Sequence, residues 1–167
     1  MARGKLVADP RFPQRSGLVV QPLGQVIIFR GQPLQVPGPA PFGHRRVVNI
    51  LGGTITGEKL SGRILPGGAD WQILAADGSA DIHARYTVES DAGALVQVDS
   101  KGVRHGPPEV LARLAKGDDV DPGLYYFRTV MRFETAHAST LWLNRILALA
   151  RGAREKNAVR LDVYEVL

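Results

Sequence analysis

Alternation of apolar and polar side chains is the main pattern along this chain, and it predicts β-strands. The clearest strand covers residues 80–89, in which one face is apolar and the other carries charged and polar groups. Residues 124–135 alternate in the same way, because successive side chains of a strand point to opposite faces of the sheet. Similar segments, separated by turn residues, predict further strands at residues 24–30, 44–51, 54–64, 70–75, 94–104, 146–150 and 159–166.

Helical features are confined to two places. Residues 107–116 begin with two prolines, which suit a first helical turn, and Gly117 can end the helix. Residues 140–144 predict a single helical turn. Residues 31–43 contain four prolines, so we expect a loop or a broken edge strand there.

These elements predict an all-β protein, a single antiparallel β-barrel of about eight to ten strands with one short helix. A chain of 167 residues is long enough for one domain with a real core. We expect that domain at residues 23–167. Residues 1–22, with three prolines and scattered charge, predict an irregular N-terminal arm. A barrel of about eight strands has room inside for side chains or for one small ligand.

The stretch from Gly62 to Gln72, GRILPGGADWQ, contains the most distinctive turn of the chain. Pro66 presets a turn conformation, and the two glycines after it can adopt positive φ without a steric penalty. Asp70 and Trp71 follow the turn as neighbours on a strand, so they point to opposite faces. One of them can lie in the core while the other lines a cavity or faces water.

Two predicted strands carry charge on one face and apolar groups on the other, and alternation does not say which face is inside. If the polar face is inside, Asp70, His83, Arg85, Arg128 and Glu134 converge in a pocket, where they must pair or bind a ligand. If it is outside, the barrel has an apolar lumen and these charges face water. Both arrangements remain open.

Composition narrows the function classes. The net charge is +5, and the first 63 residues hold nine Lys/Arg against two Asp/Glu, so the basic excess lies in the arm and the first strands. A basic stripe interleaved with aromatic residues is absent from the sequence, so we expect no nucleic-acid partner. The longest apolar run is far below the ~18 residues that span a membrane, so we expect no membrane partner.

Metal and thiol chemistry have no support in the residue pattern. The chain has no cysteine, which fits a cytoplasmic protein, and its four histidines lack the close spacing of metal ligands. We therefore expect no metal site and no cofactor.

Several ordered segments resemble a family of small, mostly bacterial proteins that is classed as a domain of unknown function. The resemblance runs from residue 24 to residue 166. It rests on Gly52-Gly53, the GRILPGGADWQ stretch, Ala84-Arg85-Tyr86, Gly102 to Glu109, Tyr125 to Arg128, Phe133-Glu134-Thr135 and Trp142-Leu143-Asn144.

This resemblance implies a compact antiparallel β-barrel. Related barrels bind small apolar molecules, and some act as cyclases or isomerases, which is an analogy at the level of the fold. The family's motif residues correspond here to Asp70, Trp71, Arg85, Tyr86, Arg128, Glu134, Trp142 and Asn144.

The first functional hypothesis is a pocket for an unknown small molecule, an apolar or anionic organic ligand, with or without catalysis. Arg85 and Arg128 would hold an anionic or carbonyl oxygen. Asp70 or Glu134 would act as acid or base, with a pKa set by the arginines and by burial. Further side chains predicted to contact the ligand are Trp71, His83, Tyr86, Trp142 and Asn144.

The second hypothesis is a non-catalytic structural or assembly module, in which the apolar faces form the interface of a homo-oligomer. The charged residues would then form structural ion pairs. A third hypothesis is attachment to anions or nucleic acid through the basic arm, which strong salt dependence of binding would reveal.

Overall fold

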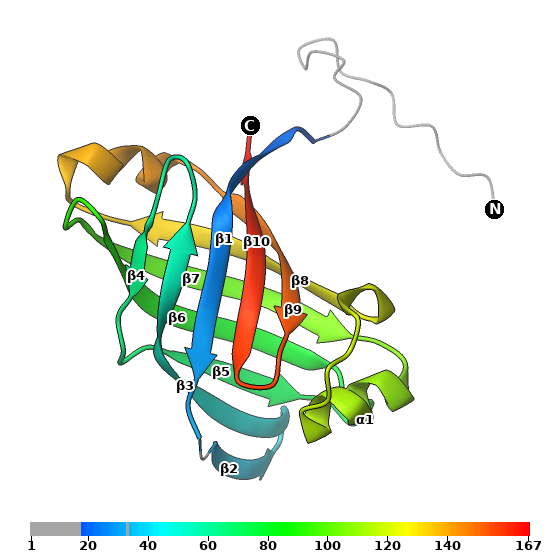
Figure 1. Ribbon diagram of the computed structural model, residues 1–167. Helices are drawn as coiled ribbons and strands as arrows, with labels where there is room; N and C mark the ends of the chain where they lie inside the picture. Colours follow the sequence, from blue (N-terminus) through cyan, green and yellow to red (C-terminus); the bar gives the residue numbers. More distant parts are fainter. Residues whose placement is uncertain (1–17, 33) are drawn as a thin grey trace.

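The computed structural model describes residues 18–32 and 34–167, and ten strands in this part of the chain form one antiparallel sheet that closes on itself (Figure 1). The strands are, in chain order, β1 (Val20–Arg30), β2 (Gln35–Ala40), β3 (Gly43–Thr56), β4 (Gly62–Ile64), β5 (Ala69–Leu74), β6 (Ala80–Ser90), β7 (Leu95–His105), β8 (Tyr126–Glu134), β9 (Ala148–Arg154) and β10 (Ala158–Val166).

The barrel closes because β1 pairs with β10 on one side and with β3 on the other. From β10 the order runs through β9, β8 and β7 to β6, and both β4 and β5 lie between β6 and β3. Strand β2 pairs with β3 at the end of this order. The prediction of a single antiparallel β-barrel of eight to ten strands is confirmed.

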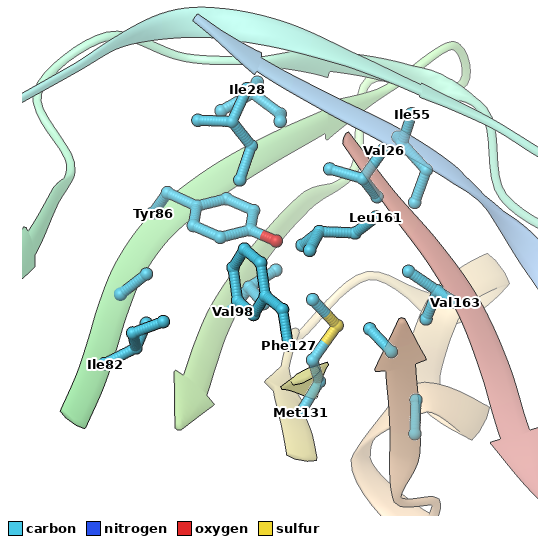
Figure 2. Packing of buried hydrophobic residues seen from close by; sticks show 14 of the residues in the cluster. Val26, Ile28, Ile55, Ile82, Tyr86, Val98, Phe127, Met131, Leu161 and Val163 are labelled. Atoms are coloured by element: carbon cyan, nitrogen blue, oxygen red, sulfur yellow. The ribbon is translucent and has the colours of Figure 1, made fainter. Parts of the chain in front are cut away.

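Apolar side chains fill the inside of the barrel. Figure 2 shows Val26, Tyr86, Phe127, Met131 and Leu161 directed into one common space from β1, β6, β8 and β10. The charged faces of β6 and β8 therefore point outward. Water solvates these charges outside, whereas several of them inside a narrow lumen would lose that solvation.

The α-helix agrees with its prediction except for its first residue. Helix α1 (Pro108–Lys116) has proline in its first turn and ends at Gly117, whose φ of 85° lies in the left-handed region. Its buried side chains, Leu111 and Leu114 among them, belong to the same apolar cluster as the barrel core.

Helices α1 and η2 (Ala138–Arg145) lie at opposite ends of the barrel (Figure 1). The predicted helical turn at residues 140–144 lies within η2, a 3-10 helix whose Leu143 is fully buried. A second 3-10 helix, η1 (Pro122–Leu124), precedes β8. None of the helices described here has the length and hydropathy that a membrane crossing requires.

The first strand begins earlier than predicted. Val20 already pairs with Val166 of β10, so β1 includes residues that the proline content assigned to the arm. The pairing register shifts between Pro22 and Gly24, and this irregularity accommodates the proline within the strand. Residues 1–17 of the predicted arm lie outside the described residues.

Candidate functional site

The GRILPGGADWQ turn joins two short strands, β4 and β5, which together fill the position between β3 and β6 in the barrel wall. Strands β4 and β5, on either side of the turn, both pair with β3 and with β6. Gly67 has a φ of 107°, which favours glycine. A Cβ on Gly68 would lie 2.5 Å from the carbonyl oxygen of Arg85, so the turn packs directly against β6.

This turn brings Asp70 to the inner face and Trp71 to the outer face. The two side chains therefore point to opposite faces, as the alternation predicts. Asp70 accepts a hydrogen bond from the side-chain amide of Gln72 and another, at 3.2 Å, from the backbone N–H of His83. The Gln72 side-chain oxygen in turn accepts from Nε of Arg46 at 2.6 Å. Gln72 therefore connects the Arg46 guanidinium to the Asp70 carboxylate.

The surroundings of Asp70 favour its protonated form. Burial raises the pKa of the Asp70 carboxyl above its ordinary value. The hydrogen bonds from Gln72 and His83 and the charges of Arg104 and Arg46 act in the opposite direction and only partly offset burial. Such a carboxyl can both hold and release a proton closer to neutral pH than an exposed aspartate.

Asp70 lines a cavity of about 40 Å³ inside the barrel. Aliphatic side chains and the rings of Tyr86 and Phe127 form much of its wall, and Figure 2 shows the Tyr86 hydroxyl directed toward the middle of the lumen. Burial raises the pKa of that hydroxyl, so it stays protonated. The volume admits a few water molecules or one small chemical group.

Two residues that line this cavity each have a buried polar atom without a hydrogen-bond partner among the described residues. These atoms are Nε of Arg104, a residue only 7% exposed, and Oγ1 of Thr129, which is 4% exposed. Buried polar groups nearly always have a partner, so each such exception calls for an explanation.

A wider pocket of about 520 Å³ adjoins the inner cavity beside α1. The two share four lining residues, Arg30, Arg46, Arg104 and Arg154. These arginines come from β1, β3, β7 and β9, so they surround the same end of the barrel.

The structure brings together only part of the predicted site. Asp70 and Tyr86 line the inner cavity. Arg85 and His83 lie on the outer face, where both contact Asp99, at 2.8 Å and 3.1 Å. The expected pocket of Asp70, His83, Arg85, Arg128 and Glu134 does not form, because the polar faces of β6 and β8 point away from the lumen.

The two predicted site residues on β8 also lie outside. The guanidinium of Arg128 stacks on the Tyr126 ring, 5.0 Å from its centroid, and donates to the carbonyl of Phe127 at 2.8 Å. Glu134 is exposed and lines an outer hollow that includes Arg85 and Asn144.

The remaining predicted ligand contacts are also away from the cavity. Trp71 is 46% exposed on the outside. Trp142 packs against the core with Lys59 over its ring. Asn144 donates to the carbonyl of Thr135 at 2.8 Å and accepts from its N–H at 2.9 Å, which fixes the η2 segment to the end of β8.

Sequence reasoning missed Arg46, Gln72, Arg104, Arg154 and Thr129. The sequence pattern contains a signal for Arg46. This residue shares a strand face with the apolar Val48 and Ile50, and a single charged residue on an otherwise apolar face indicates a polar site in the lumen.

A family model described as a protein of unknown function (DUF3237) matches residues 20–166, so the chain belongs to this family. The UPF0311 protein RPA1785 of Rhodopseudomonas palustris is 45% identical over 130 residues, which is 78% of this chain and 85% of that protein. Its crystal structure superposes with a TM-score of 0.86 and 38% identity, covering 92% of this chain and all of the other.

Two further solved structures share the fold. A β-barrel-like protein from Acinetobacter baumannii is 41% identical with a TM-score of 0.81, covering 92% of this chain and 99% of that one. A structure described as an enzyme from Penicillium herquei has a TM-score of 0.68 at 17% identity, covering 93% and 99%. At that identity the likeness shows the fold alone.

Proposed function

We propose that the barrel binds a small organic molecule at its arginine-lined end and that Asp70 exchanges a proton with it. The reaction class is an isomerisation or cyclisation that proceeds through removal of a proton next to a carbonyl group. This proposal keeps the predicted small-molecule pocket but places it on the inner face, with Asp70 and Tyr86 as the predicted residues that remain in it.

The observation that carries the proposal is the pair of unpartnered atoms, Arg104 Nε and Thr129 Oγ1. An unsatisfied buried polar group destabilises a fold by about 1–3 kcal/mol. Both residues line the cavity that holds Asp70. An oxygen of a bound molecule would give both of them a partner, because Nε donates and a hydroxyl can donate as well.

Asp70 suits the part of acid or base on that molecule. Its raised pKa brings it closer to the value at which a carboxyl transfers protons well at neutral pH. Gln72 and the backbone of His83 hold the carboxylate in place. Arg104, on the same cavity wall, would stabilise the negative charge that develops on a carbonyl oxygen when a neighbouring proton leaves.

The cavity volumes define how such a molecule would lie. The inner cavity of about 40 Å³ accepts one polar group, so the body of the molecule would occupy the adjoining pocket of about 520 Å³. Leu74, Leu111 and Leu114 give that pocket an apolar wall.

The test is exchange of the C3 protons of 2-hexanone in D₂O, followed by NMR. We expect the wild-type protein to accelerate exchange and Asp70→Asn to abolish the acceleration. Asp81→Asn is the matched control, because Asp81 is exposed on β6. Equal exchange by wild type and Asp70→Asn would refute the assignment of Asp70 as the base.

A second candidate function is association with another protein, including a second copy of this chain. An outer groove of about 600 Å³ supports it, since Val103, Tyr126 and Val130 are each more than 40% exposed along its wall. Analytical ultracentrifugation of wild type and Val130→Glu tests it. A monomeric wild-type protein would exclude a homo-oligomer.

A further inference from the structure

Four arginines line both the inner cavity and the adjoining pocket. Among the described residues, none of Arg30, Arg46, Arg104 and Arg154 has a carboxylate within 4.0 Å of its guanidinium. Arg104 is buried and the other three arginines are partly buried, and charged side chains in such positions usually have a partner. The site therefore carries more positive than negative charge.

The acidic residues lining the two pockets, Asp70 and Asp77, have other partners. Asp70 accepts from Gln72 and from a backbone N–H. Asp77 accepts from the backbone N–H of Ser79 at 2.9 Å and from its hydroxyl at 2.6 Å. Neither aspartate neutralises the arginine group as a whole.

The guanidinium groups also keep free hydrogen-bonding capacity. Arg30 donates to the carbonyl of Lys156 at 3.3 Å, and Arg154 donates to the carbonyl of Glu155 at 3.1 Å. Each guanidinium has five N–H donors, so these bonds hold the side chains in place and leave other donors available. Nε of Arg104 has no partner among the described residues.

We infer that this arginine group binds the carboxylate of an organic acid whose apolar chain lies against α1 and whose neighbouring oxygen enters the inner cavity. The inference rests on the proposed function and names its substrate class. Arginine recognises carboxylates through paired hydrogen bonds between planar groups, and the partly buried setting strengthens those bonds. The apolar chain would contact Leu74, Leu111 and Leu114.

Electrostatic repulsion supports the assignment. Burial lowers the pKa of Arg104, the charge of Arg46 lowers it further, and Asp70 and Tyr125 only partly offset these effects. Burial also lowers the pKa of Arg46 and of Arg154. Like charges held together in a partly buried space oppose folding, and a bound anion removes that repulsion.

The experiment measures the binding of two probes, 2-oxohexanoate and 2-hexanone, to the full chain by titration calorimetry. In 2-hexanone a methyl group replaces the carboxylate of 2-oxohexanoate. We expect 2-oxohexanoate to bind at least about tenfold more tightly, because charge-assisted hydrogen bonds each contribute at least that factor. Arg154→Gln and Arg30→Gln should lose this advantage, so that the two probes bind with similar affinity. Arg145→Gln is the control, because Arg145 is exposed on η2 at the other end of the barrel.

Thermal unfolding without ligand separates binding from structure. Arg154→Gln should keep the melting temperature close to that of wild type, because burial disfavours the charge that the variant removes. A lower melting temperature with equal losses for both probes would indicate a structural arginine and would overturn the inference.

The remaining outcomes separate the inference from the proposed function. Equal binding of the two probes by wild type would overturn the inference, whereas Asp70-dependent exchange of 2-hexanone would leave the proposed function standing. Tight, arginine-dependent binding of 2-oxohexanoate without any proton exchange would support the acid site and refute the catalytic part of the proposed function.

Discussion

The protein contains two clusters of aspartate and arginine, one outside the barrel and one inside, and they differ in how their charges are matched. Outside, Asp99 accepts from Arg85 at 2.8 Å and lies 3.1 Å from His83, so the acid is fully paired. Inside, Asp70 is bonded to an amide and a backbone N–H, and Arg104 keeps an unpartnered Nε within the described structure.

This difference indicates that the inner cluster, and not the outer one, is the place to look for ligand binding. Exposed ion pairs form readily because long side chains rotate in water, and they contribute about 0–1 kcal/mol. Inside the barrel the strands set the face of each side chain and packed neighbours restrict its rotamers, so a charge has less freedom to reach a partner. In the proposed function, a bound molecule supplies the match for these groups.

The largest effect is expected at the inner aspartate, and the outer aspartate serves as its comparison. Asp70→Asn should lower the rate of solvent proton exchange into 2-hexanone by about 100-fold or more, because it removes the acid or base. Asp99→Asn should leave the rate within about twofold, because Asp99 makes its contacts on the outer surface. NMR detection of exchange in D₂O measures both, and an equal loss in the two variants would break the contrast between the clusters.

The inner cluster should depend on the turn that positions it. Gly68→Ala places a Cβ 2.5 Å from the Arg85 carbonyl and should lower the free energy of unfolding by about 1–3 kcal/mol. Gly123→Ala is the matched control, because the atoms nearest to its new Cβ belong to the Asp121 side chain, the closest at 3.2 Å. Urea unfolding measures both, and equal stability of Gly68→Ala and wild type would show that the turn can move away from β6.

The pH dependence of stability should reveal the buried carboxyl. The pKa of Asp70 is raised in the folded state, so the folded protein binds more protons than the unfolded chain between the ordinary and the raised value. Stability should therefore fall as pH rises through that window, by at most about 1.4 kcal/mol per pH unit from this group. Asp70→Asn should lack this component in urea unfolding at a series of pH values, and an unchanged pH profile would contradict the raised pKa.

The smallest effect is expected for the outer cluster. Arg85→Ala should change the free energy of unfolding by less than about 1 kcal/mol, because Arg85 is exposed and its pair with Asp99 is screened by solvent. It should leave the binding of 2-oxohexanoate unchanged. Loss of that binding in calorimetry would show that Arg85 belongs to the binding site, as the sequence motif had indicated.

Much of the fold could be predicted because it follows from local rules. The strands at residues 80–89 and 124–135 and the helix that starts near Pro108 agree with their predicted positions to within two residues. The start of β1 was harder to predict from the sequence, because Val20 joins the barrel through its pairing with β10, a contact between the two ends of the domain.

Less of the site could be predicted, for a related reason. Asp70 and Tyr86 were among the candidates, but so were Arg85, Arg128 and Glu134, which lie outside. The inner arginines lie on four different strands, and only closure of the barrel brings them to one end.

The amino-acid sequence by itself determined the β class, the turn at residues 65–68 and the grouping of side chains on strand faces, because a strand alternates with a period of two. It determined that Asp70 and Trp71 would point apart. Only the tertiary structure decided which face became the inside, because closure depends on how distant strands pair. That choice placed Arg85 in water and Arg104 beside Asp70, and with them the position of the candidate site.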